Sequence, residues 1–129
     1  MNQWPNLPAF FINFGVLATF LSTLTDNPSA IDFEDTIAVI DTNYQFTPTA
    51  FHNGELHNDA GENNGSCKIL FFGILHELGE SQTLACFGRY YRSDVLLNPK
   101  GEDHQNIRNF LRYGWDRVSF NGEALTPLH

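Results

Sequence analysis

The feature that most constrains the fold of this chain is an apolar segment near its middle. Between Ser66 and Leu78, large apolar side chains fall on every side of a helix: Ile69, Leu70, Phe71, Phe72, Ile74, Leu75 and Leu78. A helix that is apolar all round has to be covered on every side. Ser66 belongs to the residue types that cap helix starts, and Gly79 is the type that ends helices. The sequence therefore predicts a buried central helix over residues 66–78, with the other elements packed around it.

Four further segments carry apolar residues at the spacing of one helical face, near residues 17–24, 33–44, 81–95 and 103–113. The first of these segments has no charged side chain, which raises the question of a membrane span. Prolines precede it and polar residues interrupt it, so we expect an amphipathic helix instead. The pattern predicts about five helices in all.

Two short segments are typical of strands. Residues 50–56 and 118–125 each place an Asn-Gly pair between alternating apolar residues, which is the strongest short-range signal for a β-hairpin. A single hairpin is marginally stable, so we expect the two hairpins to pair into one small antiparallel sheet. The predicted fold class is α+β.

The length, composition and charge limit the kinds of partner. A chain of 129 residues with 42% hydrophobic residues fits one domain with a substantial core. All seven basic residues occur at Lys68 or later, whereas eight of the fifteen acidic residues precede it, and the formal net charge is -8. Such a charge repels phosphate backbones and acidic lipid surfaces. We therefore expect no nucleic-acid partner and no membrane.

A long polar segment is the predicted working surface. Residues 47–67 are rich in asparagine, histidine and glycine, and connections of this length are often functional. We expect a cleft between this loop and the helix at 103–113, holding a small ligand or a protein partner. The predicted cleft residues are Asn53, Asn58, Asn63, Ser66, Cys67, His104, Asn106 and Arg108. All of these except Ser66 and Cys67 are expected to join in one hydrogen-bonded network across the cleft. The alternative is that the asparagines and glycines only hold a compact loop.

Cys67 offers a second kind of chemistry. Cys67 and Cys86 form neither a CxxC pair nor a disulfide framework. A thiol in the first turn of a helix can have a lowered pKa, because the helix dipole stabilises the thiolate. With a histidine base such as His104, Cys67 would then serve as the nucleophile of a hydrolase or transferase. Ordinary packing of a small side chain is the competing interpretation, so enzymatic activity stays open.

Metal binding is a weaker alternative. His52, His57 and Asp59 are close in sequence and supply nitrogen and oxygen ligands suited to zinc, as in a metal-dependent hydrolase. Their spacing matches no established metal-binding motif, so we expect solvated side chains and no bound metal. Glycine-rich phosphate loops and dinucleotide fingerprints are missing from the sequence as well, and no cofactor is predicted.

Several motifs in a fixed order resemble one known family. The strings TPTAF with NGE, NGSCK, TLACFGRYYRSDV, DHQNIRNF and Gly114-Trp115 are similar to the HopJ type III effector protein family, over roughly Gly15–Leu125. The resemblance implies a small bacterial protein of a family named for a plant-pathogen protein delivered into host cells. It implies no catalytic residues.

The resemblance also suggests a division of the chain. Residues 1–14 precede the similar part and are expected to be an N-terminal extension, whose role the sequence does not reveal. Residues 15–129 are expected to form a single HopJ-like domain. The implied location is the bacterial cytoplasm, with possible delivery into a host cell by a type III secretion system.

Overall fold

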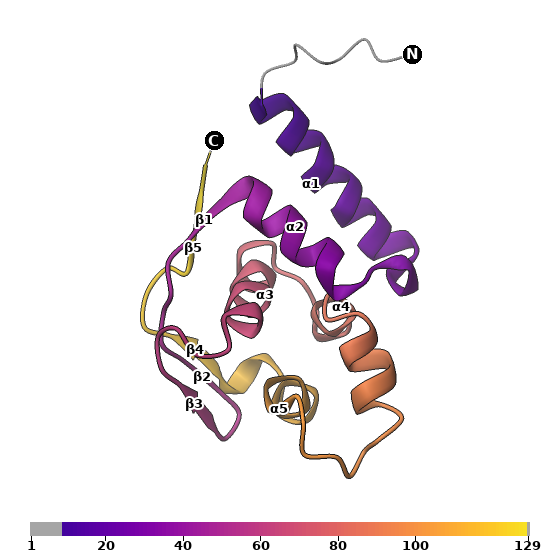
Figure 1. Ribbon diagram of the computed structural model, residues 1–129, viewed down its shortest axis with the longest axis vertical. Coiled ribbons are helices and arrows are strands. Elements are labelled where there is room, and N and C mark those ends of the chain that lie inside the picture. Colours follow the sequence, from indigo (N-terminus) through magenta and orange to yellow (C-terminus); the bar gives the residue numbers. More distant parts are fainter. Residues whose placement is uncertain (1–8, 129) are drawn as a thin grey trace.

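The centre of the fold is the helix α3 (Asn64–Leu75), which lies between the helix α2 and the strands in the computed structural model (Figure 1). The structure describes residues 9–128. The other elements, in chain order, are α1 (Ala9–Asp26), η1 (Pro28–Ala30), α2 (Phe33–Asn43), β1 (Tyr44–Phe46), β2 (Phe51–Asn53), β3 (Leu56–Asn58), α4 (Glu80–Ala85), η2 (Tyr90–Val95), α5 (Gln105–Tyr113), η3 (Trp115–Arg117), β4 (Val118–Phe120) and β5 (Leu125–Pro127). The predicted α+β class is confirmed.

The central helix differs from its prediction at both ends. It begins after Asn63, whose backbone is left-handed (φ 53°), so Ser66 is not its cap. It ends at Leu75, where the chain turns through Glu77, another residue with positive φ. Ile69, Leu70 and Phe72 and their neighbours are buried, but Ile74 and Leu75 are exposed to 42% and 41%. The prediction of a helix covered on all sides is therefore correct only up to Gly73.

The first two helices agree with the sequence pattern. Phe20 and Leu24 of α1 are buried against the core, as their spacing predicts. In α2, the side chain of Asp32 accepts a hydrogen bond from the Phe33 N–H, and Asp35 accepts one from the Asp32 N–H. This reciprocal capping box fixes the start of α2. None of the helices in the described part of the chain is long and apolar enough to cross a membrane.

The predicted helix over residues 81–95 is wrong as one element. The chain breaks at Gly88 (φ 61°), which separates α4 from the π-helical turn η2. A β-carbon at Gly88 would lie 2.6 Å from the Asp32 Cα, because the start of α2 packs directly against this turn. The apolar stripe continues through the break, so its periodicity gave no sign of it.

Only the first of the two predicted hairpins exists. β2 pairs with β3 across Gly54 and Glu55, but β4 and β5 do not pair with each other. Instead β4 joins β2 to complete the sheet β3-β2-β4, and β5 pairs with β1 in a separate two-stranded sheet. The Phe51 and Phe120 rings stack with centroids 5.0 Å apart. This cross-strand contact favours the pairing of β4 with β2 over a local hairpin.

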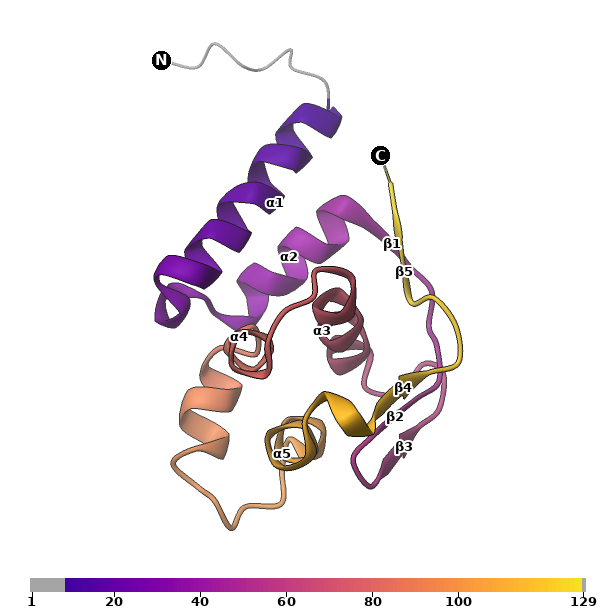
Figure 2. The same cartoon turned by 180° about the vertical axis from the view of Figure 1, so that it is seen from behind.

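The C-terminal segment connects the last helix, α5, to the three-stranded sheet. Seen from behind (Figure 2), η3 leads from α5 directly into β4. As a result α5 lies against β2 and β3, which places its first residues beside the polar loop. α1 begins at Ala9 and continues past residue 14, while residues 1–8 lie outside the described part. The proposed extension over residues 1–14 stays a prediction.

Candidate functional site

A groove with a mixed polar and apolar lining lies where the predicted cleft was expected. It has a volume of about 420 Å³ and is bounded by β3, the start of α3, the start of α5 and an aromatic wall. Its lining residues from the predicted set are Asn58, Asn63, Ser66, His104 and Asn106. Asn53 and Cys67 are buried and do not line it, and Arg108 lines a different groove.

The floor of the groove is a network of asparagine side chains. The Asn106 Oδ1 accepts hydrogen bonds from Asn53 Nδ2 (3.0 Å) and Asn58 Nδ2 (3.2 Å). In return Asn106 Nδ2 donates to Asn58 Oδ1, which also accepts from Asn63 Nδ2 at 2.7 Å. Asn53, Asn58 and Asn106 are almost fully buried. The network therefore ties β2, β3 and α3 to α5 and holds the groove in shape.

Two helices begin at this groove, and neither is capped by a side chain. Asn63 precedes α3 and His104 precedes α5, both with left-handed backbone (φ 53° and 51°). The first N–H groups that bond back along these helices are those of Cys67 and Arg108. The N–H groups before them, at Gly65, Ser66, Gln105 and Asn106, have no helical acceptor. The two helix starts thus bring N–H groups without a helical acceptor to the groove.

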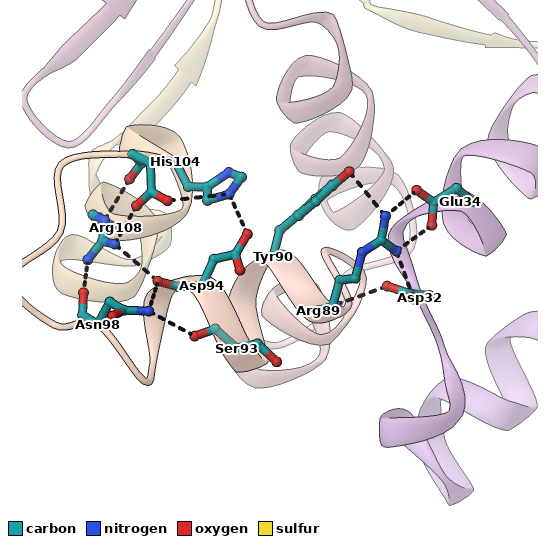
Figure 3. Close-up of polar contacts among 10 residues, drawn as sticks. Asp32, Glu34, Arg89, Tyr90, Ser93, Asp94, Asn98, His104 and Arg108 are labelled. Carbon is teal, nitrogen blue, oxygen red and sulfur yellow. Dashed lines mark hydrogen bonds and ion pairs between the residues drawn. The ribbon is translucent and has the colours of Figure 1, made fainter.

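His104 forms a cluster with acidic residues at the edge of the groove (Figure 3). Its Nε2 lies 2.9 Å from Asp94 Oδ2, and its ring stacks on Tyr90 with centroids 5.0 Å apart. Arg108 donates to Asp103 Oδ1 and to the Asn98 carbonyl. This interaction holds the pKa of Asp103 below its ordinary value of 3.8.

His104 and Arg108 are thus outside the asparagine network, contrary to the prediction that one network joins all six side chains. Both side chains bind instead to residues of η2 and of the segment that leads from it to α5. His104 contacts Asp94, and Arg108 donates to Asp103 and to the Asp94 carbonyl oxygen.

Comparisons with known proteins identify the family. The family model described as HopJ type III effector protein matches residues 17–125. The chain belongs to the HopJ type III effector protein family. A crystal structure described as that of "unknown function protein VPA0580" is similar to it, with a TM-score of 0.85 and 58% sequence identity. That match covers 86% of this chain and 92% of the other. The search of curated proteins found no match.

Cys67 of this HopJ family member does not have the environment of a nucleophile. The side chain is buried, and its Sγ lies 3.5 Å from the Thr49 carbonyl oxygen. Burial raises the pKa of the Cys67 thiol, which outweighs the lowering effects of Thr49 and Lys68. The predicted depression of this pKa is therefore wrong. The recorded partners of His104 are Asp94, Asp103 and the Tyr90 ring, so the proposed Cys67–His104 pair is not formed.

His52, His57 and Asp59 do come together on the exposed face of the HopJ-family sheet. His57 Nδ1 lies 3.1 Å from His52 Nε2, and His57 Nε2 lies 2.9 Å from Asp59 Oδ1. The two neighbours thus occupy different nitrogens of the His57 ring. An imidazole binds a metal ion through one nitrogen, so a shared ion would need both neighbours on the same side of the His57 ring. The observed arrangement, with one neighbour at each nitrogen, suits a hydrogen-bonded chain better.

Sequence reasoning missed Asp94, Tyr90 and Phe33, which complete the groove and the His104 cluster. Asp94 precedes His104 by ten residues and reaches it because the chain folds back after η2. Neither spacing nor residue type signals such a contact. Phe33 begins the apolar stripe of residues 33–44, which predicts packing in the core, and Tyr90 is an aromatic residue that the sequence likewise places in the core.

Proposed function

We propose that this HopJ family member is a binding module that holds a small ligand carrying a carboxylate or phosphate group. The observation that supports this proposal is the meeting of two uncapped helix starts in one groove. The N–H groups of Ser66 and Gln105 belong to these first turns, and both residues line the groove. Free N–H groups and the positive end of the helix dipole favour a bound anion.

The rest of the lining suits the remainder of such a ligand. Phe33, Phe87 and Tyr90 supply the aromatic part of the lining. Phe33 lies against Gly65 at the start of α3, and Tyr90 stacks on His104 just before α5. The asparagine floor is already hydrogen-bonded within itself, so it gives shape rather than ligand contacts. A molecule with one anionic group and one planar or apolar part matches this arrangement.

Arginine side chains play no part in this proposal. Arg108 and Arg112 both line a different groove, and the Arg108 guanidinium is occupied by Asp103. The anion would be held by backbone N–H groups alone in a chain of net charge -8. We therefore expect modest affinity that weakens as salt is added. Synthesis in the bacterial cytoplasm and delivery by a type III system rest on the family's name and are proposals for this chain.

The test is a titration followed through backbone amide signals. Inorganic phosphate and succinate are added to ¹⁵N-labelled full-length protein at constant ionic strength, with chloride as the reference anion. The expected result is saturable shifts of the amides of Gly65, Ser66, Gln105 and Asn106. Ser66→Asp would weaken binding at least about tenfold, equivalent to about 1.4 kcal/mol. The new carboxylate occupies the first turn of α3, where it also favours the helix.

Ser81→Asp is the matched control. It places the same carboxylate in the first turn of α4, away from the groove. Its affinity for phosphate and succinate should equal that of the unaltered protein. Equal weakening by the two substitutions would reduce the effect to overall charge and contradict the groove as the anion site. Amide shifts that do not saturate, or that occur elsewhere, would do the same.

A further inference from the structure

We propose that Asp94, Asp103 and His104 form a binding site for a transition-metal dication such as Zn²⁺. This inference does not depend on the ligand of the groove. Within the described residues, these three side chains form the one group of His, Cys, Asp or Glu in which three ligand atoms lie within 4.8 Å of one another. Of the three, His104 also lines the groove. Figure 3 shows the His104 imidazole and the Asp94 carboxylate facing each other.

The distances suit one shared ion. His104 Nε2 lies 2.9 Å from Asp94 Oδ2 and 3.9 Å from Asp103 Oδ2. Two ligand atoms that are each about 2.1 Å from a metal ion lie about 3.0–3.5 Å apart in octahedral or tetrahedral geometry. The observed separations fall on either side of this range. All three ligand atoms lie within 4.8 Å of one another, so they can close on one ion only if the Asp103 carboxylate moves toward His104.

The donor set indicates the class of metal. One imidazole nitrogen with two carboxylates suits Zn²⁺, Co²⁺ or Ni²⁺ better than Mg²⁺ or Ca²⁺, which prefer oxygen ligands alone. The three side chains are exposed to 28%, 44% and 58% for His104, Asp94 and Asp103, so water can fill the remaining positions. On binding, Nε2 gives up its proton to solvent if it carries one, and the metal takes its place.

Neighbouring residues hold the ligands in place. The Tyr90 ring stacks on the His104 imidazole, which limits its rotation. Arg108 donates to Asp103 Oδ1 and so leaves Oδ2, the oxygen nearer to His104, for the ion. Hydrogen bonds to the far atom of a ligating side chain are the usual support of a metal site. The positive charge of Arg108 also opposes the ion, so micromolar rather than nanomolar affinity is expected.

The experiment compares two histidine–aspartate pairs of this chain that have the same nitrogen–oxygen distance. His104 lies 2.9 Å from Asp94, and His57 lies 2.9 Å from Asp59. Zn²⁺ is titrated calorimetrically into full-length protein, into Asp94→Asn and into the matched control Asp59→Asn. The Asp94→Asn substitution keeps an acceptor for His104 but removes the charge. Asp103→Asn, at a more exposed side chain, is a second variant in case Asp94→Asn fails to fold.

The expected result is one Zn²⁺ per chain, with affinity reduced at least about tenfold in Asp94→Asn, or about 1.4 kcal/mol, and unchanged in Asp59→Asn. Zn²⁺ should raise the melting temperature of the unaltered protein and not that of Asp94→Asn, because a ligand of the folded state stabilises it. Co²⁺ should broaden amide signals around residues 94 and 103–104. Mg²⁺ at the same concentration should compete weakly or not at all.

Three results would overturn the proposal. One is the absence of Zn²⁺ binding below about 1 mM, which corresponds to a binding free energy weaker than about 4 kcal/mol. Another is an equal loss of affinity in Asp59→Asn. The third is Co²⁺ broadening centred on His52 and His57, which would assign the ion to the exposed sheet face instead.

Discussion

At the scale of single residues, Asn106 is the centre of the hydrogen-bond network below the groove. It is buried, and its side chain bonds to both Asn53 and Asn58. A buried amide left without a partner costs about 1–3 kcal/mol, whereas a satisfied one is close to neutral. Asn53 Oδ1 already lacks a partner, so the stability of this region depends on the hydrogen bonds that the Asn106 side chain makes with Asn53 Nδ2 and with Asn58.

Asn106→Ala should lower the free energy of unfolding by about 1–3 kcal/mol, because Asn58 loses two hydrogen bonds and Asn53 loses one. Urea denaturation followed by circular dichroism measures this change. Asn121→Ala is the control, since Asn121 is exposed and no side-chain hydrogen bond is recorded for it. A loss below about 0.5 kcal/mol for Asn106→Ala, the usual range for surface substitutions, would contradict the role of the network.

The sequence revealed part of this network. The prediction that asparagines join across a cleft is confirmed for Asn53, Asn58, Asn63 and Asn106, because polar amides in two facing segments need partners. It is wrong for His104, whose partner Asp94 no pattern indicates. Residue type thus identified the members of the network, but not the pairing of residues far apart in sequence. The ligand-binding role of these residues stays a prediction.

At the scale of elements, features that depend on neighbouring residues are easier to predict than features that depend on distant segments. The capping box at Asp32 is of the first kind, because it depends only on residues 32–35. The break at Gly88 depends on the approach of α2, which is distant in sequence. The hairpin predicted at the second Asn-Gly pair is wrong for the same reason. Phe120 packs on Phe51 and Phe71, so its strand pairs with β2 and not with the next strand in sequence.

Gly88→Ala tests the cause of this break. The substitution places a β-carbon on a backbone with φ 61° and pushes it against the Asp32 Cα and the Phe33 N. We expect the free energy of unfolding to fall by at least about 2 kcal/mol, from the unfavourable φ and the steric overlap together. Gly122→Ala is the matched control, because the nearest atom to its added carbon would be Thr49 Cγ2 at 3.8 Å. Similar denaturation midpoints for the two variants would refute this explanation.

At the scale of the whole molecule, one half-buried pair joins the end of the central helix α3 to the strand β1. His76 Nε2, just beyond α3, lies 2.6 Å from the Tyr44 hydroxyl of β1. Burial lowers the pKa of His76 below its ordinary value of 6.5. The unfolded chain therefore takes up this proton more readily than the folded protein, and proton uptake favours unfolding.

The stability of the whole molecule should consequently fall as the pH drops below about 6.5, the ordinary histidine value. The carboxylates with lowered pKa values, Asp32, Glu34 and Asp103, lose their contribution only below their ordinary values of 3.8–4.5. Between pH values of about 6.5 and about 5, His76→Gln should therefore show a flatter melting-temperature profile than the unaltered protein. Tyr44→Phe should keep the slope, because burial rather than the Tyr44 bond sets the shift. Parallel profiles for His76→Gln and the unaltered protein would show that the pH dependence arises elsewhere in the fold.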